Sequence, residues 1–388
     1  MIIALQILFF FLAFLVFHSY VLFPFILYIL TINKKLKFSE LTEKKEVTII
    51  MSLYNEESVI AEKLDSILNS DYPLDKIKII IGSDNSNDNT NEIVEAYAKK
   101  HQNIDFTAFT ERQGKSNVIN SMIDKSTSEI LILSDANVFF DKNTISELVK
   151  PFSDPKVGLV DSHMKNTGLK KEGISIQEKS YISREVYIKH REGILWGTMM
   201  GPFGGCFAMR RELYSPVPKT FLVDDFYLCM KVLEKGYKAI NNLDAVVYED
   251  VSNNLSDEFR RKVRIATGNF QNLKEFKHFL WPPWTGSAFS FLSHKVLRWI
   301  TPIFLILAWG INFYLAFLSN FYLVLFCLYN FVLLLPLIDF LLRKINIHNV
   351  FLRFITHFLS MNVALLTGMF RAMKGVKSNV WKPTKRNQ

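Results

Sequence analysis

The sequence of 388 residues has only three cysteines, Cys206, Cys229 and Cys327, and they lie far apart. Their spacing excludes a cysteine metal site and gives no disulfide framework. We therefore expect free, buried thiols in a protein of a reducing compartment. Internal repeats and low-complexity linkers are also missing, so the chain shows no sign of a repeat array.

Charge is missing from two long stretches. Residues 1–33 have no Asp, Glu, Lys or Arg, and residues 299–342 have one formal charge, Asp339. A membrane span needs about 20 apolar residues, so the first stretch predicts one span and the second predicts two. A secretory signal peptide would have a basic start and an apolar part of about 7–15 residues, and neither condition holds here. The pattern indicates an integral membrane protein.

Basic residues follow the first apolar stretch. Lys34, Lys35 and Lys37 place that end on the cytoplasmic side by the positive-inside rule. The polar middle of the chain is then cytoplasmic, and we expect the bacterial inner (plasma) membrane as its location. The apolar stretches lack paired charges, which argues against a transporter.

The net charge of +9 raises the question of a nucleic-acid partner. Residues 371–388 contain six basic residues and no acidic ones, directly after an apolar segment. Such a tail is typically held by anionic lipid head groups. We therefore expect the lipid bilayer as a partner and no nucleic acid.

Short β-branched runs alternate with amphipathic helical patterns between residues 46 and 161. This alternation predicts an α/β, Rossmann-like fold with right-handed crossovers and a mostly parallel sheet. The predicted strands are 47–53, 77–82, 104–109, 130–133 and 157–160. Helical spacing lies between the first two strands and again at 115–126.

Polar residues follow the ends of these strands. Tyr54, Asn55 and Glu56 follow the first, the segment around Asp84 follows the second, and Arg112 to Lys115 follows the third. Each could be an ordinary helix-capping turn, but the carboxyl ends of parallel strands meet at one edge, where open α/β sheets bind nucleotides. After the fourth strand, Asp135 and Asn137 offer two oxygens that can hold a divalent cation against a diphosphate.

The order of these motifs resembles the membrane-bound branch of family 2 glycosyltransferases with the GT-A fold, a branch that includes synthases of hyaluronan, chitin and poly-N-acetylglucosamine. The resemblance covers roughly residues 46–300. The motifs that carry it are Tyr54-Asn55-Glu56, Asp84, Arg112-x-Gly114-Lys115, Asp135-Ala-Asn137, Gly204-Gly205-Cys206, Asp224-Asp225 and Arg261-x-x-Arg264.

The resemblance implies transfer of a sugar from a UDP-sugar to an acceptor hydroxyl, with inversion. Asp225 would be the general base and Asp224 its neighbour, although both could simply cap a helix. Mg²⁺ or Mn²⁺ would bind Asp135 and Asn137, where the family usually has a second Asp. Asp84 would recognise the uracil and ribose.

The remaining motif residues would bind the donor or the acceptor. Lys115 would lie near the diphosphate, or else be an exposed lysine at a helix start. Arg261 and Arg264 would contact the diphosphate or the acceptor, or else rest on lipid head groups. Ile265 stands where the family has Trp, which weakens the case for a processive synthase. The other implied contacts are Tyr54, Asn55, Glu56 and Arg112 for the donor and Gly204 and Gly205 for the acceptor.

Two further helices are predicted with less chemistry. Residues 176–195 read as a long helix with a solvated face of charged pairs. Residues 350–373 are long enough to cross a membrane, but crossing would place the basic tail outside, so we favour an interfacial or re-entrant helix. The predicted regions are a transmembrane helix 1–33, a cytoplasmic GT-A domain 34–275, an interfacial segment 276–298, a C-terminal transmembrane region 299–373 and a basic cytoplasmic tail 374–388.

Three functions follow from these features. The first is a glycosyltransferase of extracellular or capsular polysaccharide synthesis, with a saccharide or lipid-linked acceptor and secretion or assembly partner proteins. The second is a non-processive enzyme that forms a glycolipid. The third is a catalytically silent subunit that binds a nucleotide sugar. This hypothesis is based on Asn137, which stands where the family usually has a second Asp.

Overall fold

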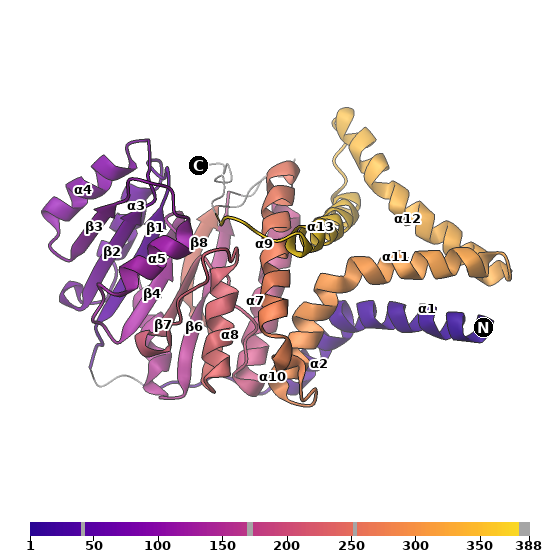
Figure 1. The fold of residues 1–388 in the computed structure, drawn as a ribbon, viewed down its shortest axis with the longest axis horizontal. Coiled ribbons are helices and arrows are strands. Elements are labelled where there is room, and N and C mark those ends of the chain that lie inside the picture. The colour runs from indigo at the N-terminus through magenta and orange to yellow at the C-terminus, as the bar shows by residue number, and fades with distance from the viewer. Residues whose placement is uncertain (40–42, 169–173, 251–253, 380–388) are drawn as a thin grey trace. The chain divides into compact units, whose positions relative to one another are not determined.

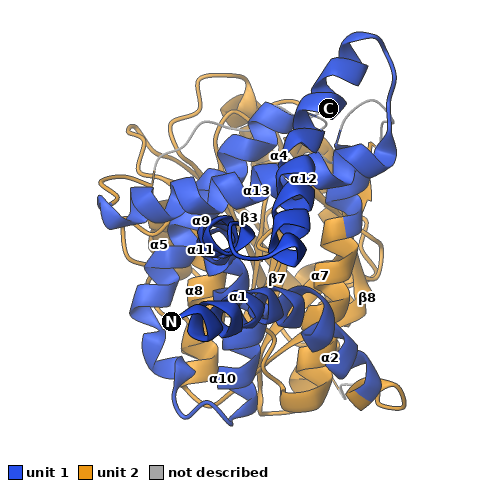
Figure 2. Ribbon diagram, turned by 90° about the vertical axis from the view of Figure 1, so that its right-hand side faces the viewer, with its two compact units in different colours: residues 1–29, 170–180, 252–375 blue, residues 30–169, 181–251, 376–388 orange. Residues whose placement is uncertain are grey.

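The computed structural model describes residues 1–39, 43–168, 174–250 and 254–379. The chain divides into two compact units, coloured separately in Figure 2. Unit 1 consists of residues 1–29, 170–180 and 252–375, and unit 2 consists of residues 30–169, 181–251 and 376–388.

Unit 2 is built on an eight-stranded sheet with the order β3-β2-β1-β4-β7-β6-β8-β5 (Figure 1). The strands are β1 Val47–Leu53, β2 Ile77–Ser83, β3 Ile104–Ala108, β4 Ile130–Ser134, β5 Val138–Phe140, β6 Val157–Thr167, β7 Cys206–Arg210 and β8 Lys238–Asp250. All five strands predicted from the sequence are confirmed. The pairings β1–β2, β1–β4 and β2–β3 are parallel, as predicted, and β6 also pairs in parallel with β8.

The other half of the sheet is mixed. Strands β5, β7 and β8 were not predicted, and β7 runs antiparallel to both β4 and β6 while β5 runs antiparallel to β8. The antiparallel β7 lies directly beside β4, so the chain that follows helix α7 (Ser175–Trp196) returns to the strand before the Asp135 turn.

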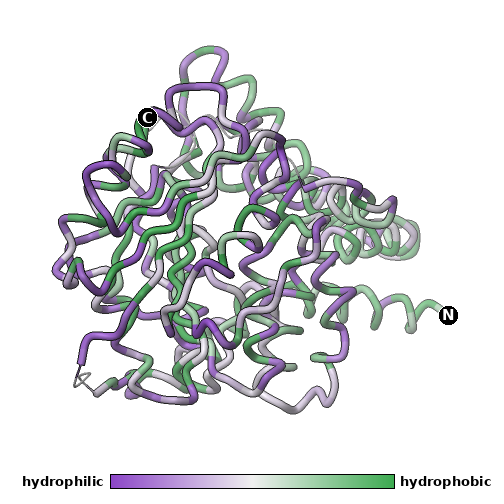
Figure 3. The backbone as a smooth tube through the Cα atoms, turned by 60° about the vertical axis from the view of Figure 1, so that its left-hand side comes forward, coloured by the Kyte–Doolittle hydropathy of each residue, from purple (hydrophilic) through white to green (hydrophobic). Residues whose placement is uncertain are grey.

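Helices cover the sheet of unit 2. They are α3 Ile60–Leu68, α4 Thr90–Lys100, α5 Lys115–Ile123, α6 Thr144–Val149 and α8 Asp224–Glu234, with short 3₁₀ turns at Leu74–Lys76, Lys150–Ser153 and Arg211–Leu213. Helix α3 buries Ile60, Leu64 and Ile67 at helical spacing against the hydrophobic core formed with the strands. Its Lys63 is also fully buried. The central strands appear green, the hydrophobic end of the scale, in Figure 3.

Unit 1 is helical. Its elements are α1 Ile2–Phe17, a π-helical turn His18–Leu22, α2 Phe23–Thr31, α9 Leu255–Glu275, a 3₁₀ turn Lys277–Leu280, α10 Gly286–Ser290, a π-helical turn Phe291–Val296, α11 Leu297–Ala316, α12 Asn320–Lys344 and α13 Val350–Met373. Helix α2 ends two residues into unit 2. Helix α7, Ser175–Trp196, begins in unit 1 and continues in unit 2.

Within the described part of the chain, four helical segments are long and apolar enough to cross a membrane, judged by length and composition: Ile2–Thr31, Gly286–Ala316, Asn320–Lys344 and Val350–Met373. Many large apolar side chains of α1 and α12 are exposed, as expected for surfaces that face lipid. Whether Val350–Met373 spans or lies at the surface stays a prediction. All three cysteines are free, and Cys206 and Cys229 are buried as expected, but Cys327 is exposed on α12.

Candidate active site

Asp84 organises the first part of the site, at the carboxyl end of β2. Asp84 is 2% exposed. Its carboxylate accepts hydrogen bonds from the backbone N–H groups of Gln113 at 2.6 Å and Gly114 at 2.9 Å. Arg112 Nε donates to the same carboxylate at 3.1 Å, and the Arg112 guanidinium lies 3.3 Å from the centroid of the Tyr54 ring. The structure therefore brings together the predicted residues that follow β1, β2 and β3.

Asn55 and Glu56 hold the loop that follows β2. Asn55 has a left-handed backbone conformation with φ of 54°, and its side-chain oxygen accepts from the backbone N–H of Asn87 at 3.0 Å. The backbone N–H of Glu56 donates to Thr90 Oγ1 at 2.8 Å. These two predicted residues therefore act on the shape of the Asp84 loop, and direct contact with a donor stays a prediction.

The turn Asp135-Ala136-Asn137 follows β4 and contacts the predicted acceptor loop. The backbone N–H of Asp135 donates to the carbonyl of Gly205 at 2.9 Å, and Ser134 Oγ donates to the same carbonyl at 3.2 Å. Lys115, the first residue of α5, places its Nζ 2.6 Å from Asp135 Oδ1. Lys115 is therefore not merely an exposed lysine at a helix start.

Asp224 and Asp225 are the first two residues of α8, and they lie on the other side of Lys115. Asp224 Oδ2 is 4.0 Å from Lys115 Nζ. Burial alone would lower the pKa of Lys115, but Asp135 and then Asp224 raise it above its ordinary value, so the ammonium is charged. One cation thus joins the turn after β4 to the start of α8.

Asp225 has the chemistry of a general base. Burial, and next the negative charge of Asp224, raise its pKa to about 7, while Lys115 opposes the rise. Gly204 has φ of +82°, and a Cβ at this position would collide with Asp225 Oδ2. Only glycine allows the backbone of the loop to approach the carboxylate so closely. The N-cap position of α8 is Val223, and Asp225 Oδ1 accepts from the backbone N–H of Phe226 at 2.6 Å in the first turn, so this carboxylate also satisfies the start of the helix.

Buried charges of α7 support the loop predicted to bind the acceptor, which contradicts the solvated face predicted for this helix. Lys189 Nζ lies 2.7 Å from Asp161 Oδ2, and both side chains are almost completely buried. Asp161 accepts from the backbone N–H of Phe203 at 3.1 Å, and Glu192 accepts from that of Met200 at 3.1 Å. The sequence pattern gave no signal for this role, because the same charges at the same spacing also suit an exposed face.

A second buried lysine lies behind the Asp135 turn. Lys63 Nζ donates to Ser134 Oγ at 2.8 Å and to the carbonyl of Val138, so it joins the residues on either side of the turn. It also lies 3.7 Å from the centroid of the Phe140 ring. Burial lowers its pKa to about 7, and the nearby groups Cys206 and Asp135 oppose this shift. Its place beside the apolar positions of α3 was the only sequence signal for it.

The oxygens of the turn fit a hard divalent cation. Among the described residues, no group of three or more His, Cys, Asp or Glu side chains is arranged to hold a metal ion. Mg²⁺ commonly needs only one or two protein oxygens together with substrate phosphates. Asp135 offers a carboxylate that is one-third exposed. Asn137 offers an amide oxygen, which faces away from Glu249 because the Nδ2 of the same amide donates to that carboxylate.

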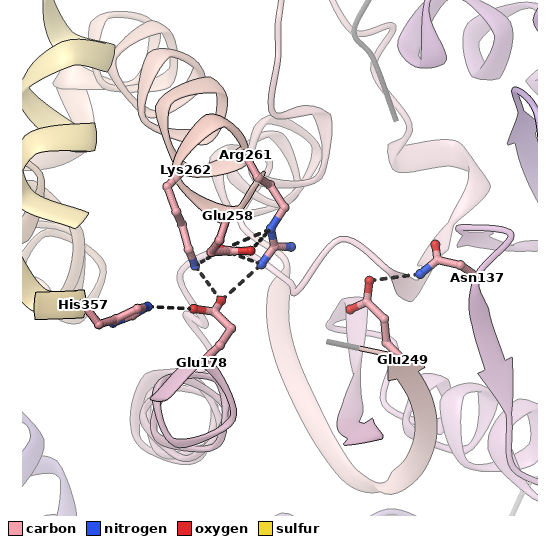
Figure 4. Close-up of polar contacts among 7 residues, drawn as sticks. All are labelled: Asn137, Glu178, Glu249, Glu258, Arg261, Lys262 and His357. Carbon is pink, nitrogen blue, oxygen red and sulfur yellow. Dashed lines mark hydrogen bonds and ion pairs between the residues drawn. The ribbon is translucent and has the colours of Figure 1, made fainter. Parts of the chain in front are cut away.

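Arg261 lies in unit 1 and pairs with carboxylates there (Figure 4). Its Nε is 3.0 Å from Glu258 Oε2, and its Nη2 is 3.1 Å from Glu178 Oε1. Glu178 also accepts from Lys262 at 2.7 Å and contacts His357 at 3.2 Å. The contact of Arg261 and Arg264 with a diphosphate or acceptor stays a prediction.

The chain beyond α13 returns to unit 2, which the sequence did not suggest. Asn379 is 6% exposed, and its Oδ1 lies where a Cβ of Gly114 would be. Its Nδ2 is buried without a hydrogen-bond partner among the described residues. The tail was predicted to rest on lipid head groups, but this part of it packs on the loop that binds Asp84.

Comparisons with known proteins agree with this arrangement. The model of glycosyl transferase family 2 matches residues 48–217. The poly-beta-1,6-N-acetyl-D-glucosamine synthase of Staphylococcus aureus (strain COL) is 25% identical over 247 residues, which cover 63% of this chain and 59% of that protein. The probable glycosyltransferase YdaM of Bacillus subtilis (strain 168) is 25% identical over 242 residues, covering 58% and 56%. The chain thus spans less than two thirds of the length of these relatives.

A solved structure shares the fold over almost the whole chain. The mannosyltransferase PcManGT of Pyrobaculum calidifontis, in complex with GDP-Man and Mn²⁺, has a TM-score of 0.73 and 23% identity, and the match covers 95% of this chain and 99% of that one. These matches show that residues 48–217, which carry the predicted motifs at the strand ends, correspond to glycosyl transferase family 2, and that the chain has the GT-A fold.

Proposed function

We propose that the protein transfers a sugar from a UDP-sugar to an acceptor hydroxyl at the membrane, with inversion, in the synthesis of an extracellular or capsular polysaccharide. The observation that carries the proposal is the position of Lys115 between Asp135 at 2.6 Å and Asp224 at 4.0 Å. It joins the residues expected to hold the leaving diphosphate to the carboxylates expected to activate the acceptor.

Asp225 removes the proton in this reaction. Its pKa of about 7 suits a general base at neutral pH, because such a group is partly ionised and still basic enough to accept a proton. The acceptor oxygen forms its bond to the anomeric carbon as Asp225 takes the hydroxyl proton. The bond from that carbon to the diphosphate oxygen breaks, and its electron pair leaves with the nucleotide.

Lys115 and the loop around Asp84 bind the donor. The ammonium of Lys115 stabilises negative charge on the departing diphosphate. Asp84 is held by Arg112 and by two backbone N–H groups, so it is already oriented before a nucleotide arrives. A buried carboxylate in a fixed position favours a nucleotide that offers it a donor.

A divalent cation, Mg²⁺ or Mn²⁺, would be held by Asp135 and Asn137. When bound, it would neutralise charge on the diphosphate as the sugar leaves. Both residues offer oxygen, which such ions prefer.

The proposed location is the inner (plasma) membrane with the catalytic unit in the cytoplasm. Lys34, Lys35 and Lys37, directly after the first candidate span, support this orientation. We retain the region 34–275 as the glycosyltransferase domain, 276–298 as an interfacial segment and 299–373 as the C-terminal membrane region.

A second candidate is a non-processive enzyme that adds one sugar to a lipid. It is favoured by Ile265 on α9, where the resembling polymer synthases have Trp.

The experiment is a transfer assay with purified full-length protein in lipid nanodiscs. UDP-glucose, UDP-N-acetylglucosamine, UDP-galactose and GDP-mannose are supplied in radiolabelled form with Mn²⁺; GDP-mannose is included because the solved mannosyltransferase shares the fold. A ladder of products supports polymer synthesis, and one lipid-soluble product supports the second candidate. Activity that is lost in Asp225→Asn excludes a silent subunit, whereas no transfer and no nucleotide release with any donor would overturn the proposal.

A further inference from the structure

The side chain of Asn137 is held by a carboxylate from β8, the strand that pairs with β5. Asn137 Nδ2 donates to Glu249 Oε1 at 3.1 Å, and the two residues are 6% and 9% exposed (Figure 4). A carboxylate can only accept hydrogen bonds, so the NH₂ end of the amide must face Glu249. The amide oxygen of Asn137 therefore points away from Glu249.

The sheet itself delivers Glu249 to this position. Strand β5 begins at Val138, directly after Asn137, and pairs antiparallel with β8 so that Val138 lies opposite Glu249. The two side chains are 112 residues apart in sequence. Their contact thus follows from strand register and does not depend on a surface loop.

We propose that Glu249 is a positioning residue for the divalent cation. It orients the amide oxygen of Asn137 toward the cation that Asp135 holds, and it supplies beside Asn137 the negative charge that a second aspartate would bring. This inference rests on the proposed function, because it requires the cation. Partners that orient metal ligands typically change metal affinity by about 10–100-fold when they are removed.

The first test measures Mn²⁺ binding to the full-length protein in detergent, by the electron paramagnetic resonance signal of free Mn²⁺, with and without UDP. Glu249→Gln keeps the size of the side chain and removes the charge, and we expect it to weaken Mn²⁺ binding by about tenfold. Glu249→Ala removes the hydrogen bond as well, and we expect a loss of up to about a hundredfold. Affinities within twofold of wild type in both variants would overturn the inference.

The double variant separates positioning from a general effect on folding. In Asn137→Asp combined with Glu249→Gln, the negative charge moves to residue 137 and the amide of residue 249 can donate to it. We expect this variant to regain Mn²⁺ affinity to within about threefold of wild type, although Glu249→Gln alone does not. A role of Glu249 in folding alone predicts no such rescue, and the absence of rescue would contradict the inference.

Asp141→Asn is the matched control. Asp141 directly follows β5 and accepts from the Tyr248 hydroxyl at 3.0 Å, so this substitution also removes a carboxylate from the β5–β8 pair. We expect its Mn²⁺ affinity to stay within twofold of wild type, and a loss equal to that of Glu249→Gln would overturn the inference.

Transfer activity distinguishes failure of this inference from failure of the proposed function. Wild-type protein that transfers sugar but does not bind Mn²⁺ would overturn the role of Glu249 alone. Wild-type protein that binds Mn²⁺ through Glu249 but releases no nucleotide with any donor would overturn the proposed function alone.

Discussion

The ammonium group of Lys115 lies 2.6 Å from Asp135 Oδ1. A divalent cation at Asp135 must therefore approach a carboxylate that already has a positive partner. In Lys115→Met we expect Mn²⁺ without nucleotide to bind about fivefold more tightly, because a partly exposed ion pair contributes up to about 1 kcal/mol. Sugar transfer is expected to fall by about a hundredfold, because the diphosphate loses a stabilising charge.

The control for Lys115 is Lys125→Met. Lys125 lies 3.6 Å from Asp105 in an exposed pair on the chain just after α5. We expect no change in metal affinity or transfer. Unchanged Mn²⁺ binding in Lys115→Met, measured by the same titration, would show that the pair does not compete with the cation.

The pH dependence of transfer reports the ionisation of Asp225. Its raised pKa of about 7 means that the base is protonated, and inactive, at lower pH. We expect kcat/KM to fall about tenfold per pH unit below pH 7. In Asp224→Asn the neighbouring negative charge is removed, so the pKa of Asp225 falls and the acidic limb moves to lower pH.

Glu234→Gln controls for the loss of a carboxylate from α8, because Glu234 lies at the other end of this helix and pairs with Lys231. Its pH profile is expected to match that of wild type. A limb that stays in place in Asp224→Asn would mean that another group titrates.

Gly204 and Gly236 test the approach of the loop to Asp225. Both have φ near +80°, but a Cβ at Gly204 would collide with Asp225 Oδ2, whereas a Cβ at Gly236 has nothing within 4 Å. We expect Gly204→Ala to lower kcat by about a hundredfold, because a small misplacement of a reacting group has an effect of this size. Gly236→Ala carries the same backbone strain and is expected to keep kcat. Equal kcat in the two variants, in steady-state assays, would show that the close approach is unimportant.

Glu178 is expected to stabilise unit 1 by pairing with two cations. Although burial alone raises its pKa, Lys262, His357 and Arg261 hold it below the ordinary value, so the carboxylate is ionised. Glu178→Gln removes this charge from Arg261 and Lys262, which are partly buried and still pair with Glu258, and we expect a loss of about 1.5–3 kcal/mol in the free energy of unfolding.

Arg260→Ala, on helix α9 next to the partners of Glu178, is the comparison. Arg260 pairs with Asp257 but is 73% exposed, and such pairs contribute about 0.5 kcal/mol or less. Denaturant unfolding in detergent, followed by tryptophan fluorescence, measures both variants. A loss in Glu178→Gln no larger than that in Arg260→Ala would contradict the prediction.

The sequence predicted those parts of the molecule that depend on local pattern. A β-branched run followed by a polar turn is visible in a few residues, so the strands just before Tyr54, Asp84 and Asp135 could be predicted. The residues expected to bind the donor follow these strands and were predicted with them. The roles of Gly204 and Asp225 were predicted only from the resemblance to a family. Their proximity depends on a loop and a helix that follow β4 at a long distance in the sequence.

Contacts between residues far apart in the sequence could not be predicted. The contact of Glu249 with Asn137 depends on the antiparallel register of β5 and β8, and no period within either segment reveals it. Buried lysines were equally hidden: Lys63 and Lys189 are polar residues that a sequence pattern assigns to a surface. Both lysines lie on helices, and their partners Ser134 and Asp161 lie on strands β4 and β6.

The burial of Asn379 against Gly114 affects how the protein should be handled. A variant cut before Asn379 would lose this contact with the loop whose backbone N–H groups orient Asp84. Donor affinities measured on protein that is shortened or altered near Asn379 should therefore be compared with those of the unaltered chain.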